Sequence, residues 1–261
     1  MSSSATTLLR SSLPPDLFDQ TTLVSLASTV AILGAAYAAS LAALPPTPTS
    51  TRSVLARHRR ALFVWHAFDA LIHFALEGGF LYHCFFSWTP LARVANPLAL
   101  APTPLNYLGH RDARAYGPQA AAPGSLAEPL ARLWMVYAKA DRRWAGADLS
   151  VISLELLTVF VAGPLAVAVC AALARGSPRA SVLMLVVATM ELYGGWVTFC
   201  PEWLTASGNL DTANPLYLWV YLVFFNGLWV ALPLYAAAVA AADIADAFAV
   251  RARAEAIAKR K

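Results

Sequence analysis

Long runs of apolar residues constrain this chain more than any other feature of its sequence. Each run is close to the roughly 20 residues that an α-helix needs to cross the hydrocarbon core of a bilayer. Because the backbone of a spanning segment must satisfy its own hydrogen bonds, runs of this length predict helices. We therefore predict an all-α fold, an integral membrane bundle of five transmembrane helices. The five runs are residues 22–44, 61–86, 149–173, 181–199 and 216–242.

The composition agrees with a membrane protein. Hydrophobic residues make up 59% of the chain and charged residues 13%, against about 45–50% and about 25% in soluble domains. The net charge of +4 comes from basic clusters beside apolar runs, which is typical of membrane flanks and predicts no nucleic-acid partner. Cys84, Cys170 and Cys200 are scattered, so we expect neither a disulfide framework nor a metal site.

The charge pattern also suggests how the chain is organised. We expect a flexible N-terminus at 1–20, a membrane domain at 21–248 with an interfacial loop at about 87–148, and a basic cytosolic tail at 249–261. Basic residues follow the first, third and fifth runs, and the positive-inside rule places these ends in the cytosol. Within the loop, Ser125 followed by Glu128 predicts a capped interfacial helix that continues through Tyr137 and Lys139.

The second apolar run contains more polar side chains than a membrane anchor needs. Asp69, His73 and Glu77 follow one another at i, i+4 steps, so on a helix they form a stripe on one face. Ionisable residues inside a membrane are costly and usually face the bundle interior or a wet cavity. His66 and His83 lie off the stripe or near the interface, and we interpret them as ordinary polar contacts.

Polar residues in the later runs could complete one pocket near the middle of the membrane. Carboxyl groups and an imidazole in such a place perturb one another and can hold a transferable proton near neutral pH. A structural interpretation stays open for the His73 to Glu77 step, and Asn226 and Trp229 can equally join or pack helices. Glu191, near the end of its run, is interpreted as partly solvated and structural. The candidates outside the second run are Glu155, Thr158, Tyr193, Asn226 and Trp229.

The order of these motifs resembles the emopamil-binding protein family, whose members carry an EXPERA domain. The resemblance runs from about residue 65 to residue 233. It departs from the family at Asp69, an added carboxylate, and at Gly195-Trp196, where the family has Gly-Asp. The matching motifs are Leu71 to Gly78, Trp134 with Tyr137-Ala138-Lys139 and Asp141, Glu155 with Thr158, Gly163-Pro164-Leu165, Tyr193-Gly194, Pro215-Leu216-Tyr217, Phe225 to Trp229, and Pro233.

The resemblance implies a cofactor-independent isomerase that shifts a ring double bond in a sterol or related polycyclic terpenoid. Protonation would give a carbocation, and loss of a neighbouring proton would follow. It also implies the endoplasmic reticulum membrane, contact with membrane lipid and a homodimer. The alternative is a membrane protein that binds sterols or cationic amphiphiles without catalysis. The expected catalytic residues are His73, Glu77 and Glu155, and the expected substrate-binding residues are Asp69, Thr158, Tyr193, Asn226 and Trp229, with no metal and no cofactor.

Overall fold

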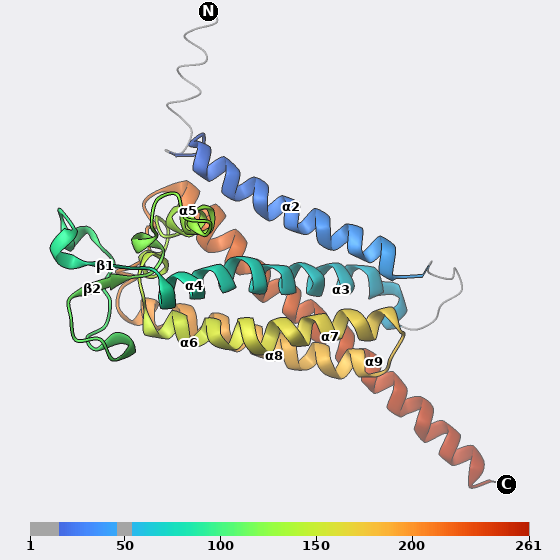
Figure 1. Cartoon of the computed structure of the whole chain (residues 1–261). Coiled ribbons are helices and arrows are strands. Elements are labelled where there is room, and N and C mark those ends of the chain that lie inside the picture. Colours follow the sequence, from blue (N-terminus) through green and yellow to red (C-terminus); the bar gives the residue numbers. More distant parts are fainter. Residues whose placement is uncertain (1–15, 46–53, 261) are drawn as a thin grey trace, which may run out of the picture. The chain divides into compact units, whose positions relative to one another are not determined.

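The computed structural model describes residues 16–45 and 54–260, and these residues are predominantly helical (Figure 1). The predicted all-α class is confirmed. The α-helices are α2 (Gln20–Ala43), α3 (Val54–Leu71), α4 (Gly78–Phe86), α5 (Glu128–Tyr137), α6 (Leu149–Leu157), α7 (Gly163–Ala174), α8 (Arg179–Leu204) and α9 (Asn226–Ala258). Three π-helical segments are η1 (Ile72–Glu77), η7 (Thr158–Ala162) and η8 (Leu216–Phe225). Two short strands, β1 (Trp88–Pro90) and β2 (Arg114–Tyr116), pair antiparallel.

Within the described residues, four helical stretches are long and apolar enough to cross a membrane. They overlap four of the five predicted runs, although the last stretch continues to Ala258, beyond the predicted end at residue 242. The chain is accordingly a membrane protein. The predicted second span is helical throughout α3, η1 and α4 but is not one of the four, and its histidines and carboxyl groups lower its apolarity. The count of five spans therefore stays a prediction. The four stretches are Gln20–Ala43, Leu149–Ala174, Arg179–Leu204 and Leu216–Ala258.

The chain divides into two compact units, each assembled from three separate segments. Unit 1 comprises Met1–Ala31, Ala75–Leu156 and Val197–Gly227, and unit 2 comprises Ile32–Phe74, Leu157–Trp196 and Leu228–Lys261. Three of the points where the chain leaves one unit for the other fall within or next to η1, η7 and η8. A π-helical turn holds more residues than an α-helical turn, so it changes which face the following residues occupy.

The core of unit 2 forms where α3, α7, α8 and α9 pack together. At one end, Arg59 of α3 donates hydrogen bonds of 2.8 Å to the carbonyl oxygens of Leu173 and Ala174. These carbonyls lie at the C-terminus of α7, where they have no partner within the helix. A basic residue that the sequence presents as a membrane flank thus also holds two helices together. The buried core residues include Leu62, Phe63, Val169, Leu173, Met184, Val187, Ala236 and Val239.

The core of unit 1 is aromatic and includes part of the interfacial loop. Trp134 of α5 stacks on Trp144, with ring centroids 4.6 Å apart, and Phe80 of α4 packs against both rings. The indole N–H of Trp134 donates to the carbonyl oxygen of Leu76 at 2.8 Å. Each tryptophan buries a large apolar area, so these contacts fix α5 on α4.

The predicted helix of the interfacial loop is confirmed as α5, but its predicted cap is wrong. Ala127 occupies the N-cap position, and no side chain caps the helix there. Instead, the Glu128 carboxylate accepts a hydrogen bond of 2.5 Å from the backbone N–H of Gly124. Pro129 at the second helical position fits this start, because a proline lacks the N–H that would otherwise need a partner.

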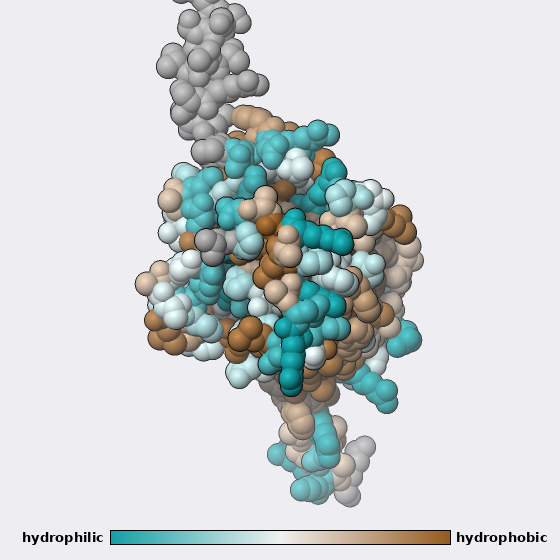
Figure 2. All heavy atoms as spheres, turned by 60° about the vertical axis from the view of Figure 1, so that its left-hand side comes forward, coloured by the Kyte–Doolittle hydropathy of each residue, from teal (hydrophilic) through white to brown (hydrophobic). Residues whose placement is uncertain are grey.

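The surface differs between the loop region and the long helices. Figure 2 shows hydrophilic side chains gathered on the face that it brings forward, with apolar side chains interspersed among them. On the long helices, large apolar side chains such as Val30, Phe160, Trp219 and Leu234 are exposed. Apolar exposure on this scale is unfavourable in water, whereas contact with lipid tails makes it favourable.

The predicted N-terminal segment 1–20 lies mostly outside the described residues.

Candidate acid and imidazole site

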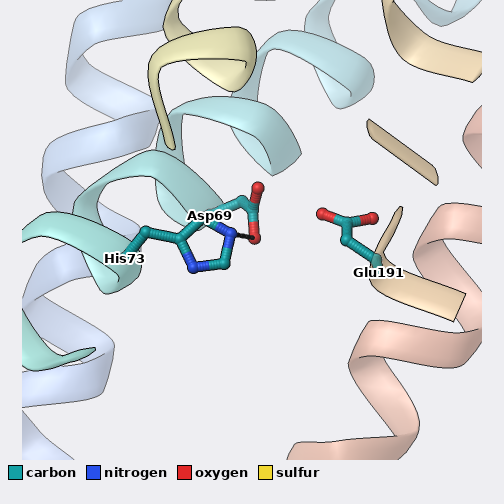
Figure 3. Close-up of side chains that lie close together, drawn as sticks. All are labelled: Asp69, His73 and Glu191. Carbon is teal, nitrogen blue, oxygen red and sulfur yellow. Dashed lines mark ion pairs between the residues drawn. The ribbon is translucent and has the colours of Figure 1, made fainter. Parts of the chain in front are cut away.

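Three buried ionisable side chains of unit 2 lie together among apolar helices. Asp69 comes from α3, His73 from η1 and Glu191 from α8, and the two carboxyl groups point toward one another (Figure 3). The Nε2 atom of His73 is 3.1 Å from Oδ1 of Asp69. One ligand-type atom from each of the three side chains lies within 4.8 Å of the other two. The prediction that Asp69 and His73 share a buried helix face is therefore confirmed.

Aromatic residues close this site on one side. The indole N–H of Trp229 in α9 donates a 2.9 Å hydrogen bond to Oδ1 of Asp69. The ring of Trp229 packs against Trp65 and Phe68, with centroid distances of 5.5 and 5.9 Å. Asp69 Oδ1 thus faces both an indole N–H and an imidazole, while the aromatic rings exclude water and strengthen these electrostatic contacts.

A glycine lets α7 approach the histidine closely. A Cβ atom added at Gly163 would lie 3.0 Å from Cζ of Phe74 and 3.4 Å from Cβ of His73. Any larger residue would push against the helical turn that carries His73. In the sequence, Gly163-Pro164 is recognisable only as part of a family motif. In the structure, Gly163 allows the short distance between α7 and the site.

Glu191 is the residue of this site that sequence reasoning missed. Its position near the end of an apolar run predicts partial solvation, but only 8% of its surface is exposed. Tyr193, two residues later, is 71% exposed. Two residues correspond to about 200° around an α-helix, so the two side chains lie on opposite faces of α8. The structure brings Glu191 to the site in place of the predicted Tyr193.

Three of the other predicted residues, Glu77, Glu155 and Asn226, belong to unit 1, whereas the trio belongs to unit 2. Glu77 and Glu155 are buried in unit 1, and Thr158 is half-buried in unit 2. In unit 1, the Asn226 amide donates to the Tyr137 hydroxyl at 3.1 Å and to the Tyr221 carbonyl at 2.9 Å. Burial raises the pKa of Tyr137, which keeps its hydroxyl protonated as a hydrogen-bond donor.

The two remaining histidines of the second run behave differently. His83 contacts the Ser87 hydroxyl at 2.8 Å and the Ala127 carbonyl at 3.1 Å, so its interpretation as an ordinary polar contact is confirmed. His66 is completely buried, and neither of its ring nitrogens has a hydrogen-bond partner among the described residues. It interacts electrostatically with Asp69, and for this histidine the interpretation is wrong.

Unit 1 holds a second buried acidic cluster, which sequence reasoning also missed. Arg143 donates from Nε and Nη2 to the two carboxylate oxygens of Asp141 at 2.9 and 2.6 Å. Its Nε atom is 3.6 Å from Glu202, and its Nη1 donates to the Thr198 carbonyl at 2.7 Å. Burial raises the pKa of Asp141, and Arg143 opposes that shift. Arg143 thereby holds the loop to the last turns of α8.

The trio in unit 2 is compact enough for one metal ion to reach an atom of each side chain. Asp69 Oδ1 already accepts the indole N–H of Trp229 and faces the imidazole of His73, so a cation there would compete with both. The arrangement can keep a proton inside an apolar protein, next to groups that can both give and take it.

These features define a helical membrane protein with buried acid and imidazole groups, and comparison with known proteins shows which family it resembles. Residues 129–240 match the model of EBP, described as EXPERA, the expanded EBP superfamily. The predicted emopamil-binding protein resemblance is therefore confirmed over this segment. Glu155, Thr158, Glu191, Asn226 and Trp229 lie inside the matched segment, whereas Asp69, His73 and Glu77 precede it.

Several curated relatives are similar over part of the chain. The 3-beta-hydroxysteroid-Delta(8),Delta(7)-isomerase of Mus musculus is 35% identical over 104 residues, which are 40% of this chain and 45% of that protein. An isomeliandiol synthase of Melia azedarach is 31% identical over 104 residues, 40% of this chain and 48% of that protein. A probable 3-beta-hydroxysteroid-Delta(8),Delta(7)-isomerase of Oryza sativa subsp. japonica is 26% identical over 174 residues, which are 67% of this chain and 63% of that protein. In the first two cases the chain spans about half the length of the relative that it matches.

Proposed function

We propose that this protein is a cofactor-independent isomerase that moves a ring double bond in a sterol or a related polycyclic terpenoid. The relatives named as sterol isomerases and isomeliandiol synthase support this class of substrate. The observation that carries the proposal is the buried ion pair of His73 and Asp69. Packing alone does not require ionisable groups in an apolar helix bundle, where each costs free energy.

The reaction adds one proton to the substrate and removes another proton from it. His73 donates a proton to one alkene carbon, and the other alkene carbon becomes a carbocation. A carboxylate then removes a proton from the carbon next to the cation, and the electrons of that C–H bond form the shifted double bond. Glu77 and Glu155 are the proposed partners in this exchange, as proton donor or acceptor. No atom is gained or lost, so no oxidant or reductant is consumed.

The surroundings of His73 suit a carbocation. Asp69 and His73 are buried, next to the packed aromatic rings of Trp65, Phe68 and Trp229. Exclusion of water in this way would protect the cation from capture. We also propose Asp69, Thr158, Asn226 and Trp229 as residues that shape the substrate site. For Tyr193, we propose contact with an entering substrate, because its side chain is exposed on the surface of α8.

The proposal includes a cellular setting. We place the protein in the endoplasmic reticulum membrane as a multi-pass protein whose C-terminus is cytosolic. The basic residues at the end of α9, including Arg251 and Arg253, support this orientation through the positive-inside rule. A homodimer and contact with membrane lipid are part of the same proposal. Fusing a reporter that is active on only one side of the membrane to the C-terminus tests the orientation.

Incubation with a sterol in deuterated water tests the proposed chemistry. Membranes containing wild-type protein, Glu77→Gln or His73→Gln receive a Δ8-sterol, and products are analysed by mass spectrometry and NMR. We expect a Δ7 product with ring deuterium from the wild type, and at least about 10²-fold less from either variant. Glu255→Gln, an exposed carboxyl on the C-terminal part of α9, is the matched control and should retain full activity.

The same experiment separates the enzyme from a binding protein. Wild-type protein that holds the sterol but forms no deuterated product would contradict isomerisation of that substrate. Unchanged turnover in His73→Gln would remove the histidine from the mechanism. Binding of a cationic amine does not discriminate, because an ammonium group resembles the carbocation beside carboxylates.

A further inference from the structure

The acid and imidazole trio of unit 2 has an excess of acidic groups. Asp69 and Glu191 are two carboxyl groups beside a single paired imidazole, and all three side chains are buried. With both carboxyls ionised and His73 protonated, the trio would carry a net negative charge in an apolar interior. Two nearby carboxylates in such surroundings disfavour their joint ionisation, and an uncompensated buried charge is very costly. One additional proton makes the trio neutral.

We propose that Asp69 and Glu191 share one proton, and that this carboxyl pair positions His73 for proton transfer. The catalytic part rests on the proposed isomerase function, whereas the shared proton does not. Asp69 and Glu191 act as positioning residues, because they act through His73. Neither residue is part of the family motifs on which the sequence resemblance depends.

The contacts of Asp69 explain how one carboxyl can serve both neighbours. Its Oδ1 atom accepts from Trp229 and faces Nε2 of His73. This leaves Oδ2 for the carboxyl group of Glu191, which points toward Asp69 from α8 (Figure 3). Trp229 is the fixed donor in this set, since its indole N–H neither gains nor loses a proton. The trio is thus oriented by a group whose charge cannot change.

His66 is a second imidazole close to this cluster. It lies one turn before Asp69 on α3, is completely buried, and interacts electrostatically with Asp69. Its two ring nitrogens have no hydrogen-bond partner among the described residues, which is costly for a buried polar group unless something binds there. With His66 included, two acids face two imidazoles, and a proton can move among them without changing the total charge.

The carboxyl pair has a direct consequence for the histidine. Nε2 of His73 lies 3.1 Å from Oδ1 of Asp69, and this ion pair fixes the orientation of the ring. If Asp69 carried a full, unshared charge, it would hold the His73 proton strongly. Sharing a proton with Glu191 weakens this hold and makes His73 a better acid. Glu191 therefore tunes the acid without touching the substrate.

Infrared spectroscopy of the full chain in lipid vesicles tests the shared proton. A protonated buried carboxyl gives a C=O stretching band that shifts in deuterated water. We expect such a band in the wild type, its loss in Glu191→Gln, and a shifted band in Asp69→Asn, where Glu191 remains as a lone acid. Glu255→Gln should leave the band unchanged. Labelling glutamate with carbon-13 in the wild-type protein shows whether a glutamate contributes to the protonated band, even if a variant fails to fold, and absence of a labelled band would contradict a proton shared by Glu191.

Two results would overturn the proposal. If the difference between wild type and Glu191→Gln contains carboxylate bands alone, both acids are ionised and no proton is shared. If the protonated band appears only after a chelator has removed a bound metal, a cation occupies the cluster. Both results are independent of isomerase activity, so they do not depend on the proposed function.

The positioning role is tested by kinetics once turnover is established. We expect Glu191→Gln to lower kcat by at least about tenfold with KM nearly unchanged, because Glu191 acts on the acid and not on substrate binding. Glu191→Asp, which retains an acid, should recover part of the rate. Equal loss in the Gln and Asp variants, or a loss confined to KM, would contradict a positioning role.

Discussion

The protein contains two buried acidic clusters that handle their charges in different ways. In unit 1, Asp141 and Glu202 surround Arg143, whose guanidinium keeps its charge at every physiological pH. In unit 2, Asp69 and Glu191 surround His73, whose imidazole can gain or lose a proton. A cluster built on arginine has a fixed charge and suits a structural role. A cluster built on histidine has a charge that can change, which suits proton transfer.

The comparison predicts that the two clusters fail in different ways when they are altered. Loss of the cation in unit 1 should strongly destabilise the fold, because two acids would stay buried without a positive charge beside them. Alteration of the acids in unit 2 should spare the fold, because the cluster can adjust its protons. Measurements of unfolding and of turnover on the same variants separate these outcomes.

The largest effect is expected for Arg143→Met in unit 1. This change leaves Asp141 and Glu202 buried without their partner, and it should lower the free energy of unfolding by roughly 3–5 kcal/mol. Denaturation in mild detergent, followed by tryptophan fluorescence, measures the loss. Arg132→Met is the matched control, since Arg132 pairs with Glu128 at the surface of α5 and should leave the unfolding transition unchanged. Equal stability of both variants would refute the structural role of Arg143.

Asp69→Asn should produce the opposite pattern. The amide retains the size of the carboxyl group and can still accept from Trp229, so the free energy of unfolding should change by only about 1 kcal/mol. Turnover should fall by about 10²-fold, because His73 loses the carboxylate that orients it. Kinetics and denaturation on the same preparation provide the measurement. A variant that unfolds as readily as Arg143→Met would erase the distinction between the clusters.

Gly163→Ala tests how closely α7 must approach the histidine. The added methyl group would collide with the ring of Phe74, and crowding of this kind costs about 1–3 kcal/mol. We also expect lower turnover, because the displaced turn carries His73. Gly195→Ala on α8 is the matched control: its Cβ would meet nothing within 4 Å, and alanine there should leave stability equal or slightly higher. Thermal unfolding of the two variants decides whether the close approach matters.

Trp229→Phe should have a smaller effect than Gly163→Ala. It retains most of the aromatic packing but removes the N–H that Asp69 accepts, and we expect a stability loss of about 1–2 kcal/mol. Trp219→Phe on η8, where the ring is exposed, should have less effect. Thermal scans of both variants against wild type provide the measurement. An equal shift in the two would show that the hydrogen bond to Asp69 contributes nothing.

The sequence by itself determined the helical fold and one contact of the site. Apolar runs of spanning length predict helices because the backbone must satisfy its own hydrogen bonds in a bilayer, and four helical stretches in the structure match these runs. The i, i+4 step from Asp69 to His73 predicts their contact because both lie on one helix. Such predictions succeed because they depend on residues that are close in the sequence.

Tertiary structure decided which other side chains join that pair. Glu191 and Tyr193 both carry polar groups on α8, and the neighbouring helices determine that Glu191 turns inward while Tyr193 turns outward. The π-helical turns of Ile72–Glu77 change the phase of the predicted stripe at Glu77. Arg143 is a loop residue whose acidic partners include Glu202, distant in the sequence. The periodicity of one helix cannot specify these contacts, because each depends on the packing of a segment far away in the chain.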